Sequence, residues 1–167
     1  MILNNVLRHL PVSLAIVPFV ASSVQASPVI NEVLGSTTGS DSEYIEFFGD
    51  PGASLGGLSL IIVESDVESS IGAIDRRIDF GDSDVIGDNG SYLLANSIAE
   101  STYGVTANLG IANNFVENSS YTIALVETSS ISGDSVAGSE VVLDAVGVTD
   151  GGTEDTFFFA APVIGPD

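Results

Sequence analysis

Short apolar runs separated by turn residues make up most of the chain beyond residue 26. Eight of these runs have the length and the β-branched or aromatic content of strands: Val29–Leu34, Glu43–Phe47, Leu58–Glu64, Arg77–Phe80, Tyr92–Ala95, Tyr121–Glu127, Val141–Val148 and Thr156–Phe159. Gly, Asp, Ser and Asn lie between them, as expected for turns. Many short strands with frequent turn signals predict an all-β domain, either a β-sandwich or a barrel.

One run differs from the others because its apolar residues do not alternate with polar ones. Leu60–Val63 is continuously apolar, which predicts a central strand that is covered on both faces. Helical periodicity is weak throughout, and the best helical candidate is Ala95–Tyr103, which polar and small residues interrupt. The pattern therefore predicts a single β-rich domain.

The first 26 residues have the organisation of a secretory signal peptide. Arg8 and His9 precede the apolar stretch Leu10–Val20, whose 11 residues are too few to span a bilayer. Small residues end the segment, so we predict cleavage between Ala26 and Ser27. The alternatives are an uncleaved anchor or a first core strand. The signal peptide predicts a protein that is secreted or held at the cell surface, with no membrane attachment after cleavage, and a mature domain over residues 27–167.

Composition then excludes several kinds of chemistry. The chain has 23 acidic residues, three arginines and no lysine, cysteine or tryptophan. Cleavage would remove Arg8 and the single histidine, leaving two arginines and a formal charge of −21. Disulfides, cysteine nucleophiles, Schiff-base lysines, a Ser-His-Asp triad and histidine-ligated metals are thereby excluded from the mature domain. Direct nucleic-acid binding is not expected either, because such binding depends on lysine and arginine contacts to phosphates.

A loop rich in aspartate is the first candidate site. Four carboxylates fall within ten residues, at Asp79, Asp82, Asp84 and Asp88. Calcium takes six to eight oxygen ligands from flexible loops, so these residues predict a calcium site. Ile86 and Leu93 stand where an EF-hand requires oxygen ligands, so the loop is not an EF-hand. The alternative is an acidic turn exposed to solvent. Asp150–Asp155 is a second acidic loop with fewer ligands, and a Gly-rich turn is the simpler interpretation.

Three glutamates fall within the first two predicted strands. Glu43 and Glu46 are three residues apart and are expected to point to opposite faces of their strand. Glu32 and Glu46 are expected to meet if the two strands pair, and a glycosidase requires two carboxylates at a defined separation. Solvent exposure, or hydrogen bonding to loop backbone, is the simpler expectation for all three.

Two further features leave alternatives open. Arg76-Arg77 stands between Asp75 and Asp79, which suggests local ion pairing or an anchor for an anionic group. Near the end of the sequence, Phe157–Ile164 is strongly apolar. This segment suggests either a fragment of a longer protein or a last strand that docks into the sheet.

Several of these runs, taken in order, resemble the lamin-tail domain. The resemblance is carried by Ile30–Val33 (INEV), Glu43–Phe47 (EYIEF), Leu55–Leu60 (LGGLSL), Gly90–Leu94 (GSYLL) and Asp144–Gly147 (DAVG). It covers most of residues 28–150. The sequence departs from the family pattern at Gly49-Asp50, where many members have N-x-[GS], and at Leu58, where tryptophan is frequent.

This resemblance implies an immunoglobulin-like β-sandwich without catalysis of its own. In bacteria the family is often found in secreted proteins beside nuclease, phosphatase or other hydrolase domains. The expected function is therefore a secreted binding or targeting module, the N-terminal accessory domain of a larger extracellular nuclease or other hydrolase. Its expected partner is a protein or a polysaccharide. Two other hypotheses stay open: a calcium-stabilised surface or adhesion protein, and a small carboxylate-based hydrolase.

Overall fold

A computed structural model of the chain describes residues 26–35, 37 and 39–165, and the predicted signal peptide lies outside these residues except for Ala26. Within the described residues the strands form two sheets. The first sheet has the order β1-β2-β5-β6, with bounds Val29–Leu34, Tyr44–Phe48, Ser91–Ala95 and Leu109–Gly110. The second has the order β4-β3-β7-β8-β9, with bounds Ile74–Asp79, Leu58–Glu64, Tyr121–Glu127, Val142–Val148 and Val163–Ile164. The predicted all-β sandwich is confirmed.

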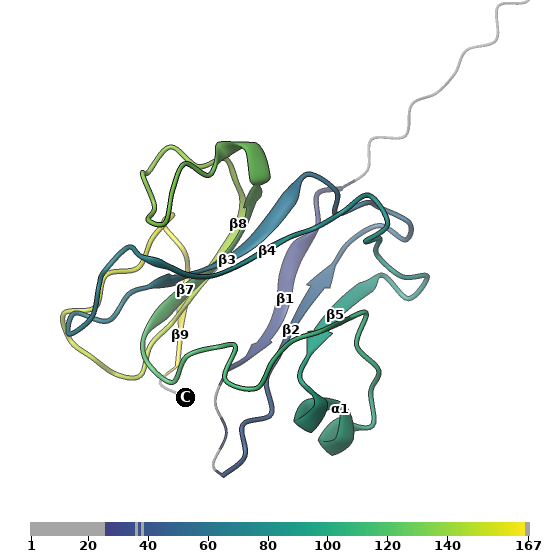
Figure 1. Ribbon diagram of the computed structural model, residues 1–167, viewed down its shortest axis with the longest axis horizontal. Helices are drawn as coiled ribbons and strands as arrows, with labels where there is room; N and C mark the ends of the chain where they lie inside the picture. Colours follow the sequence, from purple (N-terminus) through teal and green to yellow (C-terminus); the bar gives the residue numbers. More distant parts are fainter. Residues whose placement is uncertain (1–25, 36, 38, 166–167) are drawn as a thin grey trace, which may run out of the picture.

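Strand pairing is antiparallel except at one edge of each sheet, where the two-residue strands β6 and β9 pair in parallel. In Figure 1, β1, β2 and β5 form one group of strands and β3, β7 and β8 form the other. A hydrogen bond also links the two sheets, because the Ile30 backbone N–H donates to Asp144 Oδ2 at 2.7 Å. The edge strand β1 is thus tied to β8 as well as to β2.

The main hydrophobic core lies between the two sheets. It contains buried side chains from both, including Ile45, Phe47, Leu94, Ile62 and Ile123. The rings of Phe47, Phe80 and Tyr92 pack edge to face, with centroids 5.7 and 5.9 Å apart. These contacts explain why apolar residues alternate along β2 and β5, whose other face is turned outward.

The outer face of the second sheet is also covered. Ile61 and Val63 belong to a second buried cluster, on the face of β3 opposite Leu60 and Ile62. Partly buried residues of the chain's last third cover this cluster, including Val136, Phe158 and Phe159. The prediction of a central strand covered on both faces is therefore confirmed.

The strand predicted over Thr156–Phe159 is wrong. This segment contains turns, and Phe159 and Ala160 have positive φ angles of 61° and 53°. Phe158 and Phe159 both pack on the outer cluster of β3, whereas an extended strand would direct consecutive side chains to opposite faces. The chain then continues into β9, which pairs with β8, so this apolar segment docks onto the sheet.

The predicted helical candidate does contain a helix, α1, over Ser97–Tyr103. The Asn96 side chain caps its N-terminus by accepting from the Ala99 N–H at 2.8 Å, and Gly104 ends it at a φ of 67°. Figure 1 places α1 beside β5 and β2. No helix in the described part of the chain is long and apolar enough to cross a membrane.

Because both faces of β3 are covered, shortening a buried side chain on either face should destabilise the protein to a similar extent. Ile61→Ala and Ile62→Ala should each lower the free energy of unfolding by about 2 to 5 kcal/mol, because each removes a fully buried side chain. Urea denaturation of the two variants measures this. Val141→Ala, at a half-exposed position, serves as the control and should change stability by less than about 0.5 kcal/mol. A cost below about 1 kcal/mol for Ile61→Ala would contradict the outer core.

Candidate functional site

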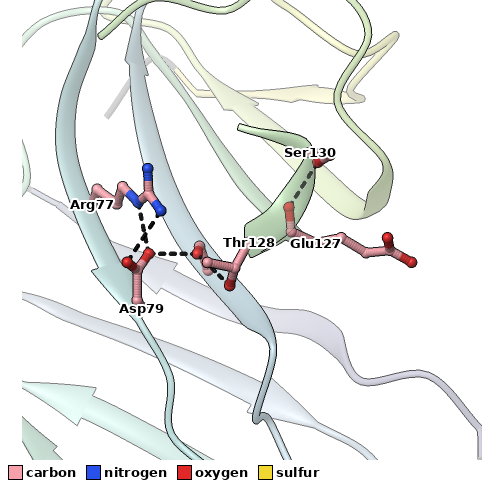
Figure 2. A network of polar contacts seen from close by, with 6 residues as sticks. Arg77, Asp79, Glu127, Thr128 and Ser130 are labelled. Carbon is pink, nitrogen blue, oxygen red and sulfur yellow. Dashed lines mark hydrogen bonds and ion pairs between the residues drawn. The ribbon is translucent and has the colours of Figure 1, made fainter. Parts of the chain in front are cut away.

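Asp79, the first residue of the predicted calcium loop, lies at the end of β4 and is engaged by an ion pair. Arg77 Nε is 2.6 Å from Asp79 Oδ1 and Nη2 is 3.1 Å from Oδ2, and Figure 2 shows the two side chains facing each other. Ser59 Oγ also donates to Oδ1 at 2.6 Å. The hydrogen bond from Arg77 lowers the pKa of Asp79, and the Ser59 hydroxyl adds to this effect. The expected local ion pair is thus found for Arg77.

The other three aspartates of the loop are spread along it. Asp84 accepts from the Tyr92 hydroxyl and from the Gly81 N–H, both at 2.8 Å. Burial of Tyr92, together with its hydrogen bond to Asp84, raises the pKa of Tyr92. Asp82 lies against Gly56, and Asp88 is exposed in the turn before β5.

These four aspartates do not form a compact group of ligands. Among the described residues, three or more candidate metal ligands come within 4.8 Å of one another only at Glu64, Asp75 and Glu117. In the other predicted acidic loop, Asp150 and Asp155 both approach the Ser120 hydroxyl, at 3.0 and 2.6 Å. The calcium site at the Asp79–Asp88 loop stays a prediction.

The three-carboxylate cluster is formed by Glu64 at the end of β3, Asp75 on β4 and Glu117 in the loop before β7. Glu64 is buried and its Oε1 accepts from the Asp66 N–H at 2.8 Å. Asp75 Oδ2 is buried and accepts no hydrogen bond from any described residue. Burial, followed by the charge of neighbouring carboxylates, raises the pKa of both Asp75 and Glu117, although Arg76 partly opposes this. The cluster therefore favours the uptake of a proton.

Glu43 has a structural role at the junction of β2, α1 and the loop before β7. Its side chain is fully buried and accepts three hydrogen bonds: from Asn96 Nδ2 at 3.0 Å, from the Phe115 N–H at 3.2 Å and from the Val116 N–H at 3.1 Å. Asn96 returns a bond by accepting from the Glu43 N–H at 3.3 Å. The simpler expectation, hydrogen bonding to loop backbone, is correct for this residue.

Glu32 and Glu46 lie on the outer face of the first sheet. They are directly opposite in the pairing of β1 with β2, as the sequence predicted for paired strands. With Tyr44, Leu93, Tyr103 and Val105 they line a hollow of about 250 Å³, which we call the tyrosine–glutamate groove. Glu43 is buried inside while Glu46 faces outward, so these two residues point to opposite faces as expected.

The groove combines aromatic and acidic groups. The Tyr44 and Tyr103 rings pack edge to face with centroids 5.8 Å apart. Burial, followed by the negative charge of Glu32, raises the pKa of Tyr44. Asn31 Nδ2 donates to Glu46 Oε1 at 2.7 Å. Glu46 is thus oriented by a neutral donor from the neighbouring strand.

Half of the groove was not predicted from the sequence. Tyr103 ends α1 and Val105 follows it, whereas Leu93 lies on β5 opposite Glu46. The capping residues Asn96 and Gly104 are the signal that could have located this helix, because they bracket it closely. Which strand the helix would pack beside is set by the tertiary fold.

Comparison with known proteins does not assign the chain to a family. It matches no family model, and no curated protein matches it.

The three-carboxylate cluster predicts that stability rises as the pH falls from 7.5 towards about 4.5. A pKa raised in the folded state contributes stability that is complete below the ordinary pKa, about 3.9 for Asp and 4.3 for Glu, and is lost as the pH rises through the raised value. Asp75→Asn should stabilise the protein at pH 7.5 by about 1 kcal/mol, since unit charges about 4 Å apart repel by roughly that much even in water.

Denaturation at several pH values measures this effect. Glu127→Gln is the matched control, because it removes one charge at an exposed position far along β7 and should leave the pH dependence unchanged. Equal pH profiles for wild type and Asp75→Asn would disprove a role for the cluster.

Because Glu43 is buried and hydrogen-bonded, we expect even a substitution of similar size to lower the stability of the protein strongly. Glu43→Gln should lower the free energy of unfolding by about 2 to 4 kcal/mol, because the amide removes the charge and places a donor against buried donors. Glu46→Gln, on the same strand but facing outward, should change it by less than about 0.5 kcal/mol. Urea denaturation compares them, and similar costs for both would contradict the assigned role of Glu43.

Proposed function

We propose that the protein is a secreted, non-catalytic binding module of the lamin-tail type. It would serve as an accessory domain that directs a nuclease or other hydrolase of the same polypeptide to its partner. The observation that carries this proposal is the tyrosine–glutamate groove, in which exposed aromatic and apolar side chains surround a pair of carboxylates on a sheet face. Tyr103 and Val105 are 50% and 41% exposed, so the domain's own core does not use them.

Four of the other carboxylates have structural roles. Glu43 holds two backbone N–H groups and Asn96, and Asp144 holds the Ile30 N–H across the two sheets. Asp79 forms an ion pair with Arg77, and Asp84 accepts a hydrogen bond from the Tyr92 hydroxyl. These four groups are committed to hydrogen bonds that maintain the fold, whereas the groove presents its two carboxylates beside exposed apolar and aromatic side chains.

A small carboxylate-based hydrolase is the competing hypothesis, because Glu32 and Glu46 do meet across the strands. The test is an assay of the exported chain on glycan and phosphodiester substrates. We expect wild type and Glu46→Gln to give the same rates as a buffer blank. Turnover that Glu46→Gln abolishes would overturn the non-catalytic proposal. Sequencing of the exported protein should find Ser27 at its N-terminus, and retention of an uncleaved chain would contradict the secreted assignment.

A further inference from the structure

Among the described residues, no arginine pairs with the two opposed carboxylates of the groove. Like charges directly opposite each other on antiparallel strands repel, with Cβ atoms only about 4.5–5.5 Å apart. In the part of the chain that the structure describes, the arginines are Arg76 and Arg77, both on β4 of the other sheet. Arg77 pairs with Asp79, and Arg76 donates to the backbone oxygens of Asp75 and Asn114. The arginines that the structure describes are therefore engaged on the other sheet, and they leave the two glutamates open to a cation from another molecule.

The walls of the groove suit a cation carried on an apolar stem. Leu93 and Val105 provide aliphatic surface, and the Tyr44 and Tyr103 rings meet edge to face beside the two carboxylates. Cations are attracted to aromatic faces, and long basic side chains pack their methylene groups along apolar surface. A volume of about 250 Å³ fits one such side chain, since sites for drug-sized ligands start at roughly 300 Å³.

The carboxylates also retain acceptor capacity. Glu46 accepts one hydrogen bond at Oε1 from Asn31, and Glu32 is exposed to solvent. An ionised carboxylate has about four acceptor positions, so each glutamate can take further donors. The neutral Asn31 amide orients Glu46 without cancelling its charge.

We propose that the tyrosine–glutamate groove binds an arginine side chain from an exposed segment of a partner protein, with the guanidinium between Glu32 and Glu46. This proposal rests on the proposed function and names the chemistry of the partner. Arginine fits better than lysine because its planar group has five donors, is weakly hydrated and can bridge two carboxylates while it stacks on an aromatic ring. The formal charge of −20 favours encounter with a basic segment.

The test uses the exported, isotope-labelled protein and a capped Gly-Gly-Arg-Gly-Gly peptide, followed by amide chemical shifts. We expect saturable shifts confined to residues around Glu32, Glu46 and Tyr103, with a Kd of the order of 1 mM. The same peptide with citrulline, which has nearly the shape of arginine but no charge, should bind at least tenfold more weakly. Citrulline binding as tight as that of arginine would overturn the proposal.

A pair of double variants separates the groove from general electrostatic attraction. Glu32→Gln with Glu46→Gln should weaken binding of the arginine peptide at least tenfold. The matched control, Glu68→Gln with Glu127→Gln, removes the same charge at two exposed positions that flank the other sheet, and should change Kd less than twofold. Equal losses in both double variants, or shifts spread over the whole acidic surface, would overturn the site.

The outcomes also distinguish this inference from the function on which it rests. Absence of arginine binding, together with absence of turnover, would remove the arginine site and leave the non-catalytic module standing. Turnover lost in Glu46→Gln would instead overturn the non-catalytic function itself, whatever the peptide titration shows.

Discussion

The buried contact between Glu43 and Asn96 fixes the part of the structure on which the groove depends. Glu43 ends the loop before β2, and Asn96 lies between β5 and α1. Their side chains and backbones exchange hydrogen bonds, while Glu43 also holds the Phe115–Val116 backbone. Asn96 caps α1 at the same time, so this single contact sets where the helix begins. The helix in turn brings Tyr103 against Tyr44, which forms one wall of the groove.

Acceptors outnumber cationic donors so strongly in this chain that most carboxylates are satisfied by neutral groups. Backbone N–H groups serve Asp144 and Glu140, and a tyrosine hydroxyl serves Asp84. Such bonds hold loops and sheet edges in place without any ion pair, and they stabilise the ionised carboxylate. An acidic composition is thereby compatible with an ordered sandwich.

The strands were predictable where their side chains face a core, and less so elsewhere. Leu58–Glu64 and Tyr121–Glu127 have the bounds that their apolar, β-branched composition indicates, because they pair at the centre of the second sheet. The edge strand β4 begins at Ile74, three residues before its predicted start, since its polar residues resemble a loop and only pairing with β3 makes them a strand. Phe158 and Phe159 have strand-like composition, but instead of forming a strand they cover the outer face of the second sheet.

The candidate sites were predictable only as far as local pattern determines them. The opposition of Glu32 and Glu46 follows from strand pairing, which the alternation of residues indicates. The three-carboxylate cluster unites residues from β3, β4 and a loop 42 positions beyond Asp75, and no local pattern places these together. Tyr103 was assigned to a weak helical segment whose packing partner depends on the buried Glu43–Asn96 contact.

Burial decides how each of the two acidic clusters relieves its repulsion. At Glu64, Asp75 and Glu117 one side chain is buried and an oxygen of another is inaccessible, so a proton is the smallest group that can neutralise the charge. Protonation there costs little because burial already disfavours the ionised form. Glu32 is exposed and Glu46 only partly buried, so water solvates both side chains. The residual repulsion at this open site is relieved when an external cation binds. Repulsion between neighbouring carboxylates therefore has two different consequences. In the buried cluster it makes stability depend on pH, and in the exposed pair it favours the binding of an external cation that we propose.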